Sequence, residues 1–414
     1  MQTADRVFPG LTALALMTAA LLGYEVLLTR AVAIQHWHHL TAVVIAVALL
    51  GLGCIGSLAA AFSAVARRHE RGLMSAGALA TALAIPLSLA LASQVPLNML
   101  ALPWYGLQQA GWLLLYALCY LLPFLCGAVF ITLAFMRWAN VIGHCYAADL
   151  AGSALGVVLV LAWLDDMLVP DATLEAAVRL SAVLPVLAFL LLERMRLQRI
   201  VIAVAVLAGI FFGFSNARLG IAPSDFKALS VQLTERDARV LWQRDTSQSR
   251  LTVVQSAAQH KAPGLSIRSR REAPRQWQAY RDGEDVLPLL RDAGEGTYRT
   301  FFDAVLAGAA FRAAPRASRV LLLPGNPSWQ AWNAHWHGAE SLTLVVPDRG
   351  LAALLGGNVF PDQPFLPPGS RMAIMHARRY LEGAREPFDL IMADMGASLL
   401  VIGNGMRALS VSEA

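Results

Sequence analysis

Long apolar stretches dominate the first half of the chain, and a shorter alternation of strands and helices follows in the second half. Each apolar stretch approaches or exceeds the roughly 20 residues that a helix needs to cross a bilayer. The first stretch lacks a small-residue cleavage site and leads directly into further spans, so it is not interpreted as a removable signal peptide. The pattern predicts a transmembrane helical domain at 1–216, with about seven spans at 7–29, 40–66, 73–94, 111–136, 146–164, 178–192 and 200–215.

A polar linker at 217–239 separates this domain from a small β segment at 240–290. Residues 250–255 alternate like a strand, with 264–268 as the expected hairpin partner, and 276–282 form a strand that ends at the Asp282-Gly283 turn. A helix is expected through 298–311. Strands at 319–323, 341–346, 371–375 and 388–394 then alternate with helices at 329–337, 349–355 and 377–383. This alternation predicts a parallel α/β domain at 291–414, truncated because too few residues follow Asp394 to complete it.

Composition agrees with this division, because 57% hydrophobic and 15% charged residues make the chain too apolar for an ordinary soluble protein. Basic residues beside the spans are unevenly shared. Eight lie on the amino-terminal side, namely Arg6, Arg67, Arg68, Arg71, Arg137, Arg194, Arg196 and Arg199, and four on the other, namely Arg30, Arg179, Arg218 and Lys227. The positive-inside bias therefore predicts a cytoplasmic amino terminus, and seven spans then place the second half in the periplasm. No basic tract suited to nucleic acid is found. The four cysteines lie in or beside apolar segments and are interpreted as packing residues.

Three segments of the second half follow the small β segment and its Asp282-Gly283 turn: RVLLL at 319–323, SLTLVVPD at 341–348 and FDLIMAD at 388–394. In this order they resemble the spermidine synthase family, whose members transfer an aminopropyl group from decarboxylated S-adenosylmethionine to putrescine. GYEVLLTR at 23–30, HWHH at 36–39 and YAADLAGSALG at 146–156 resemble bacterial proteins in which a multi-span domain is fused to such a synthase. The resemblance implies a Rossmann-like, methyltransferase-type fold and a bacterial inner membrane location.

The resemblance also implies where cofactor would bind, and most of those positions are replaced. Gly325 alone survives from the glycine-rich turn after the first strand, and the neighbouring Pro324 and Pro327 remove backbone donors. Val346 stands where an acid binds the ribose hydroxyls. Asp348 is similar to a second family acid, and it is equally interpreted as the cap of the next helix.

His376 occupies the place of the acid that reads adenine, either as a base contact or as an ordinary surface histidine. Asp394 matches the family's catalytic aspartate, which helps to deprotonate the attacking amine. Ala397 replaces the second acid of that motif, which would neutralise the cationic polyamine.

Polar residues within the spans give a second set of candidates, because ionisable groups are costly in a bilayer. Glu25 and Arg30 are interpreted either as a functional pair or as an interfacial ion pair that fixes helix depth. Asp149 either caps the fifth span or pairs with a neighbouring helix. Gly152 and Gly156 follow Ala148 at four-residue spacing, which favours close helix packing. The glycines at 51–56 fit GxGxxG, but they lie inside a span and also indicate helix packing.

His36, His38 and His39 cluster after the first span. Imidazoles at this spacing are able to bind a transition metal or haem, or to titrate near neutral pH, and histidine is also common at membrane interfaces.

These observations favour an integral membrane protein whose degenerate synthase-like domain is non-catalytic, needs no cofactor and acts as a binding or scaffold subunit with a protein partner. One alternative is a membrane-anchored aminopropyltransferase that uses decarboxylated S-adenosylmethionine, with Asp394 as base. Another is transport or metal handling by the helical bundle.

Overall fold

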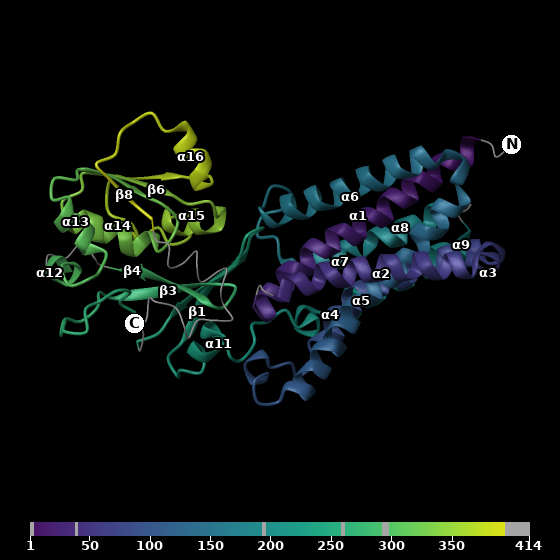
Figure 1. The fold of residues 1–414 in the computed structure, drawn as a ribbon, viewed down its shortest axis with the longest axis horizontal. Coiled ribbons are helices and arrows are strands. Elements are labelled where there is room, and N and C mark those ends of the chain that lie inside the picture. The colour runs from purple at the N-terminus through teal and green to yellow at the C-terminus, as the bar shows by residue number, and fades with distance from the viewer. Residues whose placement is uncertain (1–3, 38–39, 193–195, 258–260, 292–297, 394–414) are drawn as a thin grey trace. The chain divides into compact units, whose positions relative to one another are not determined.

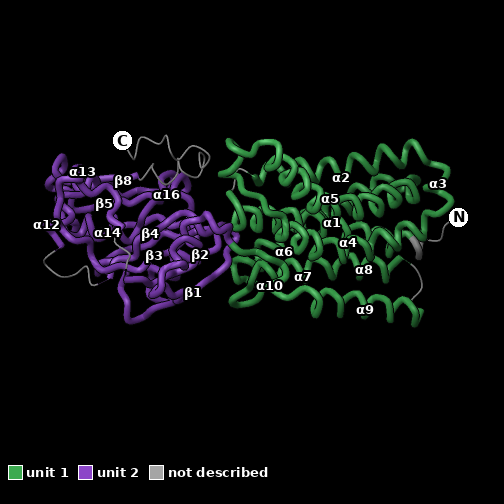
Figure 2. The backbone as a smooth tube through the Cα atoms, turned by 90° about the horizontal axis from the view of Figure 1, so that it is seen from below, with its two compact units in different colours: residues 1–222 green, residues 223–414 purple. Residues whose placement is uncertain are grey.

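The computed structural model describes residues 4–37, 40–192, 196–257, 261–291 and 298–393 of the 414-residue chain. It consists of two compact units, Met1–Ala222 and Pro223–Ala414 (Figure 2). The first unit is a bundle of apolar helices, and the second combines two β-sheets with short helices (Figure 1).

Six stretches of unit 1 have the length and composition of membrane spans: Val7–Gln35, Thr41–Ala61, Glu70–Ala92, Gly106–Arg137, Ala139–Leu164 and Leu174–Leu191. A further apolar helix, Leu197–Gly213, is 17 residues long and corresponds to the seventh predicted span. The helices of this unit are α1 (Ala4–Gln35), α2 (Thr41–Ala61), α3 (Ser63–Arg68), α4 (Glu70–Ala92), α5 (Gly106–Arg137), α6 (Ile142–Leu164), α7 (Leu174–Ser181), α8 (Val183–Leu191), α9 (Leu197–Gly213) and α10 (Asn216–Leu219).

Helices α1 and α6 pack closely through glycine. A Cβ atom at Gly152 would lie 2.2 Å from the carbonyl oxygen of Ala15, and one at Gly156 would lie 2.2 Å from that of Ala19. Because these positions meet in the same order along both helices, α1 and α6 run parallel. The predicted packing role of the small residues in α6 is confirmed.

The GxGxxG segment of α2 fulfils its expected packing role at one position only. A Cβ atom at Gly51 would lie 2.7 Å from the Cβ of Phe124 in α5, whereas Gly53 and Gly56 have no described atom close to their Cβ positions. The prediction of packing was wrong for these two residues, because α2 turns them away from α5. They lie in exposed or half-exposed parts of an apolar helix.

Two contacts identify the ends of the bundle. Gly10, near the start of α1, lies against the ring of Trp138, which directly follows Arg137 at the end of α5. At the other end of α1, the Gln35 side-chain amide donates a hydrogen bond to the Gly220 carbonyl oxygen at 2.9 Å. The chain therefore leaves unit 1 at the end opposite to its amino terminus.

Unit 2 begins with α11 (Ala228–Gln232) and a four-stranded antiparallel sheet. Its strands are β1 (Arg239–Asp245), β2 (Arg250–Gln255), β3 (Gln276–Arg281) and β4 (Asp285–Leu290), in the order β1-β2-β3-β4. The strands expected at 250–255 and 276–282 are confirmed. Strand β4 escaped prediction because Pro288 argues against a strand, yet β4 is an edge strand of this sheet, where proline is tolerated.

Two predictions in this region were wrong. The expected hairpin partner at 264–268 is not a strand, since Leu265 makes only an isolated bridge to Val305, and β1 and β3 flank β2 instead. The helix expected at 298–311 is broken into α12 (Arg299–Phe302) and α13 (Gly308–Ala313). The bridge at Val305 interrupts it, and Gly308 approaches the Phe302 carbonyl too closely for a side chain.

A second, parallel sheet follows in the order β7-β6-β5-β8. Its strands are β5 (Arg319–Leu322), β6 (Ser341–Val345), β7 (Ser370–Ala373) and β8 (Leu390–Met392), and the connecting helices are α14 (Pro327–Trp336), α15 (Arg349–Leu355) and α16 (Ala377–Gly383). The predicted alternation of strands and helices is confirmed.

One hydrophobic core joins the two sheets of unit 2. Leu251 and Val253 of β2 belong to the same cluster of buried side chains as Val320 and Leu322 of β5. In contrast, helix α16 has no buried residue, and Ile391 of β8 is 52% exposed. Among the described residues, the parallel sheet is therefore well covered on its core side and poorly covered near Ile391.

Candidate functional site

The carboxyl edge of the parallel sheet is the expected ligand site of unit 2. After β5 the chain turns through the buried Gly325 into α14, which begins at Pro327. Proline is well suited to this first helical position, but it supplies no N–H to a ligand. Val346, directly after β6, is buried, and its N–H donates to the Ala373 carbonyl oxygen at 3.0 Å. This edge therefore offers neither a glycine-rich cradle nor an acid at the ribose position.

Asp348 is the N-cap of α15, as one of its two interpretations expected. Its carboxylate accepts hydrogen bonds from the N–H groups of Gly350 at 2.8 Å and Leu351 at 3.2 Å. It also accepts from the hydroxyls of Ser249 at 2.6 Å and Thr246 at 3.4 Å, in the turn between β1 and β2. The side chain is 4% exposed. Asp348 thus joins the two sheets, and its acceptor capacity is used within the protein.

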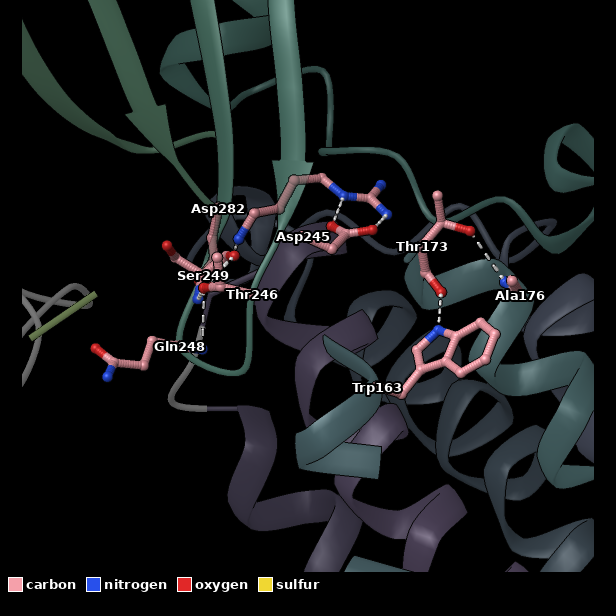
Figure 3. Close-up of polar contacts among 9 residues, drawn as sticks. Trp163, Thr173, Ala176, Asp245, Thr246, Gln248, Ser249 and Asp282 are labelled. Atoms are coloured by element: carbon pink, nitrogen blue, oxygen red, sulfur yellow. Dashed lines mark hydrogen bonds and ion pairs between the residues drawn. The ribbon is translucent and has the colours of Figure 1, made fainter. Parts of the chain in front are cut away.

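The turn between β1 and β2 is itself ordered by polar contacts (Figure 3). The Thr246 hydroxyl accepts from the N–H groups of Gln248 and Ser249. Beside it, Arg250 and Asp245 form a buried ion pair with a shortest N–O distance of 2.6 Å. This pair and the Asp348 contacts are structural, because they hold strand ends and an inter-sheet contact together.

His376 and Asp394 complete the expected set. His376 is exposed and directly precedes α16, where it makes no side-chain cap, so it has the position of a surface histidine at a strand end. Asp394 lies outside the described residues. Neither of two surface cavities in the described part of unit 2 is lined by Gly325, Val346 or His376.

Helical spacing does not favour a direct ion pair between Glu25 and Arg30, and both interpretations of these residues stay predictions. Both residues are half-buried in or near the last turns of α1, but five positions separate them, and helical neighbours are three or four apart. The interpretation of Asp149 as a helix cap was wrong, because α6 begins at Ile142 and Asp149 lies two turns inside the helix. Its backbone carbonyl oxygen accepts from the Thr18 hydroxyl of α1 at 3.1 Å.

A buried polar cluster near the end of α1 was not foreseen. The hydroxyls of Tyr116 and Tyr120 in α5 donate to the Gln35 side-chain oxygen at 3.0 and 2.9 Å. The ring of His36 meets Tyr116 edge-on, with centroids 5.0 Å apart. Deeper in the bundle, Tyr24 and Ser88 share a hydrogen bond of 2.5 Å. The available signal was the presence of glutamine and tyrosine within otherwise apolar spans.

The three histidines predicted as metal or haem ligands are placed only in part. His36 is buried against Tyr116, whereas His38 and His39 lie outside the described residues. Elsewhere in the described ranges, no group of three or more His, Cys, Asp or Glu side chains is arranged to hold a metal ion. The metal hypothesis therefore stays a prediction.

Comparison of the chain with protein-family models, with curated proteins and with solved structures gave no match.

Proposed function

We propose that the chain is an integral protein of the bacterial inner membrane whose second unit is a Rossmann-like, non-catalytic relative of the spermidine synthases. In this proposal it acts as a binding or scaffold subunit of a membrane complex. The observation that carries the proposal is the state of Asp348, whose carboxylate is occupied by internal donors. With Val346 buried in the place of the ribose acid, a nucleoside would find no free carboxylate among these described positions.

The proposed location of unit 2 is the periplasmic side, where adenosyl cofactors are scarce. Two observations support it. Gln35 and Gly220 meet at the end of the bundle opposite to the amino terminus. Arg137 marks the other end, to which the positive-inside bias assigns the cytoplasm.

Calorimetric titration of the full chain in detergent tests the loss of the synthase site. Decarboxylated S-adenosylmethionine and putrescine are expected to give no saturable heat, while a working spermidine synthase in the same buffer serves as the positive control. Micromolar binding of both compounds would overturn the proposal. Turnover of labelled substrates that Asp394→Asn abolishes would establish the aminopropyltransferase instead.

The poorly covered part of the parallel sheet supports the scaffold role, because Ile391 is an exposed apolar side chain on a strand. Native gel electrophoresis of solubilised membranes tests it. The chain is expected to migrate in a complex larger than itself, and Ile391→Asp is expected to release it. Ile267→Asp is the matched control, since Ile267 is fully exposed in a loop. Migration at the size of the single chain would refute the scaffold role.

The buried cluster around Gln35 favours a second candidate, which is ligand or metal handling by the bundle. Polar residues inside membrane bundles are costly and commonly mark functional pathways. Elemental analysis and a visible spectrum of the purified chain test the cofactor form of this candidate. Metal or haem that His36→Ala removes would support it, and a preparation free of both would refute that form.

A further inference from the structure

A basic cavity of about 480 Å³ opens at one end of the antiparallel sheet of unit 2. The alternating strand directions bring the starts of β1 and β3 and the ends of β2 and β4 to this end. Its lining includes Arg239 at the start of β1, Arg275 just before β3 and Arg291 just after β4. Three residues far apart in the sequence thus contribute guanidinium groups to one cavity.

The arginines outnumber the acids in the described lining of the cavity. None of the three forms an ion pair with a described carboxylate. Arg291 is held by a hydrogen bond from its Nε to the Gln363 side-chain oxygen at 2.7 Å, and its guanidinium carbon lies 4.6 Å from the centroid of the Trp277 ring. One guanidinium is therefore fixed in place, and the other two, on Arg239 and Arg275, are exposed to solvent.

A single described acid, Asp237, lines the cavity, and its carboxylate is engaged locally. It accepts hydrogen bonds from the Ala257 N–H and from the Ser256 hydroxyl, the latter at 3.0 Å. The Ala257 N–H is the largest cause that keeps the pKa of Asp237 below its ordinary value, and the Ser256 hydroxyl and the nearby Arg239 guanidinium also contribute. The acid is therefore charged at neutral pH, and three arginines still leave the described lining with a positive excess.

Two ion pairs lie at the opposite end of the same sheet. There Arg250 pairs with Asp245, and Arg281 pairs with Asp285. In both pairs the carboxylate lies on the strand adjacent to that of the arginine. In contrast, the described lining of the basic cavity holds three arginines and one acid.

We propose that the basic cavity binds a small soluble polyanion that carries at least two phosphate or carboxylate groups. Guanidinium groups match both kinds of group through paired hydrogen bonds. The volume lies within the range of pockets that hold small metabolites. The site is separate from the expected nucleoside edge and takes the opposite charge to a polyamine, so it stands or falls independently of the proposed scaffold role.

Calorimetric titration of the full chain in phosphatidylcholine nanodiscs, at low salt, tests the proposal with inorganic pyrophosphate and citrate as probes. At least one probe is expected to bind with a stoichiometry of one and to weaken as salt is raised. Putrescine is expected not to bind. Repeating the titration in phosphatidylglycerol nanodiscs distinguishes the sources, because a site for lipid headgroups would then be occupied and the soluble probe would be displaced. That displacement would overturn the assignment to a soluble ligand.

Substitutions locate the site. Arg239→Ala and Arg275→Ala are each expected to weaken binding about tenfold or more, the effect of losing one charge-assisted hydrogen bond. Arg270→Ala is the matched control, because Arg270 is an exposed loop residue outside the lining. Asp237→Asn is expected to strengthen binding, since it removes the negative charge and keeps one oxygen acceptor. The proposal would be overturned if neither probe showed saturable binding. It would also be overturned if Arg270→Ala lost as much affinity as Arg239→Ala and Arg275→Ala.

Discussion

Replacement of Asp348 by alanine should loosen unit 2 rather than remove a ligand site. The change deletes the N-cap of α15, which is worth about 0.5–2 kcal/mol. It also leaves the buried Ser249 hydroxyl without its 2.6 Å acceptor, at a further cost of about 1–3 kcal/mol. Together these losses amount to about 1.5–5 kcal/mol, which corresponds to a roughly 10-fold to 4000-fold shift in the local opening equilibrium.

Hydrogen exchange followed by mass spectrometry on the full chain measures this effect directly. Amides of α15 and of the β1–β2 turn are expected to exchange faster by that factor, because Asp348 joins these two segments. Amides of α1 and α6 in unit 1 supply the internal reference. Asp362→Ala is the matched control, since Asp362 is exposed and makes no described hydrogen bond or ion pair. Unchanged exchange in Asp348→Ala would refute the structural role of this carboxylate.

Four further outcomes are expected. Gly152→Leu should separate α1 from α6 and lower the thermal stability of the solubilised chain, whereas Gly53→Leu, at an open position, should not. Gln35→Leu should destabilise the bundle by about 1–3 kcal/mol, because a buried tyrosine hydroxyl loses its acceptor; Gln108→Leu, on an exposed surface, is the control for the same thermal measurement. The backbone N–H groups of Arg319 and Ser318 lower the pKa of Asp389 below 3.8. Ionised Asp389 therefore stabilises the fold above pH 3.8, and this stabilisation is lost as the pH falls through the lower pKa of the folded state. Asp389→Asn should accordingly flatten the acid side of the profile of stability against pH. Alkaline phosphatase fused to the carboxy terminus should be active, and an inactive enzyme would contradict the proposed periplasmic side.

Most of the helices and the parallel strands were predictable because their signals are local. The apolar length of α4 and the apolar run of β6 are each read from one continuous segment, without knowledge of its partners. Strand β4 was missed because the tolerance of Pro288 depends on its edge position, which only the assembled sheet defines. The partner of β2 was misassigned for a similar reason, since pairing with β3 is set by contacts across the sheet.

The candidate site was less predictable than the fold. The alternative interpretations of Asp348 were resolved by the hydroxyls of Ser249 and Thr246, about 100 positions earlier in the chain. The basic cavity carries no motif, because its arginines stand at separate strand ends and meet only when the antiparallel sheet forms. Local sequence rules identify candidates of the right chemical type, but distant contacts decide whether such residues are structural or available.

The distribution of charge within unit 2 bears most directly on its function. A polyamine needs uncommitted carboxylates in a partly enclosed site, yet the two buried acids of the described part of this unit are both in use. Asp245 is paired with Arg250, and Asp348 is held by backbone and hydroxyl donors. At the far end of the same sheet, the described lining of the cavity around Arg239 carries an excess of positive charge. Burying a diamine there would bring like charges together in a region of reduced dielectric, whereas an anion would relieve the existing repulsion. With its described buried acids committed to structure and three arginines lining one cavity, unit 2 is expected to favour anionic ligands over the cations that a spermidine synthase must hold.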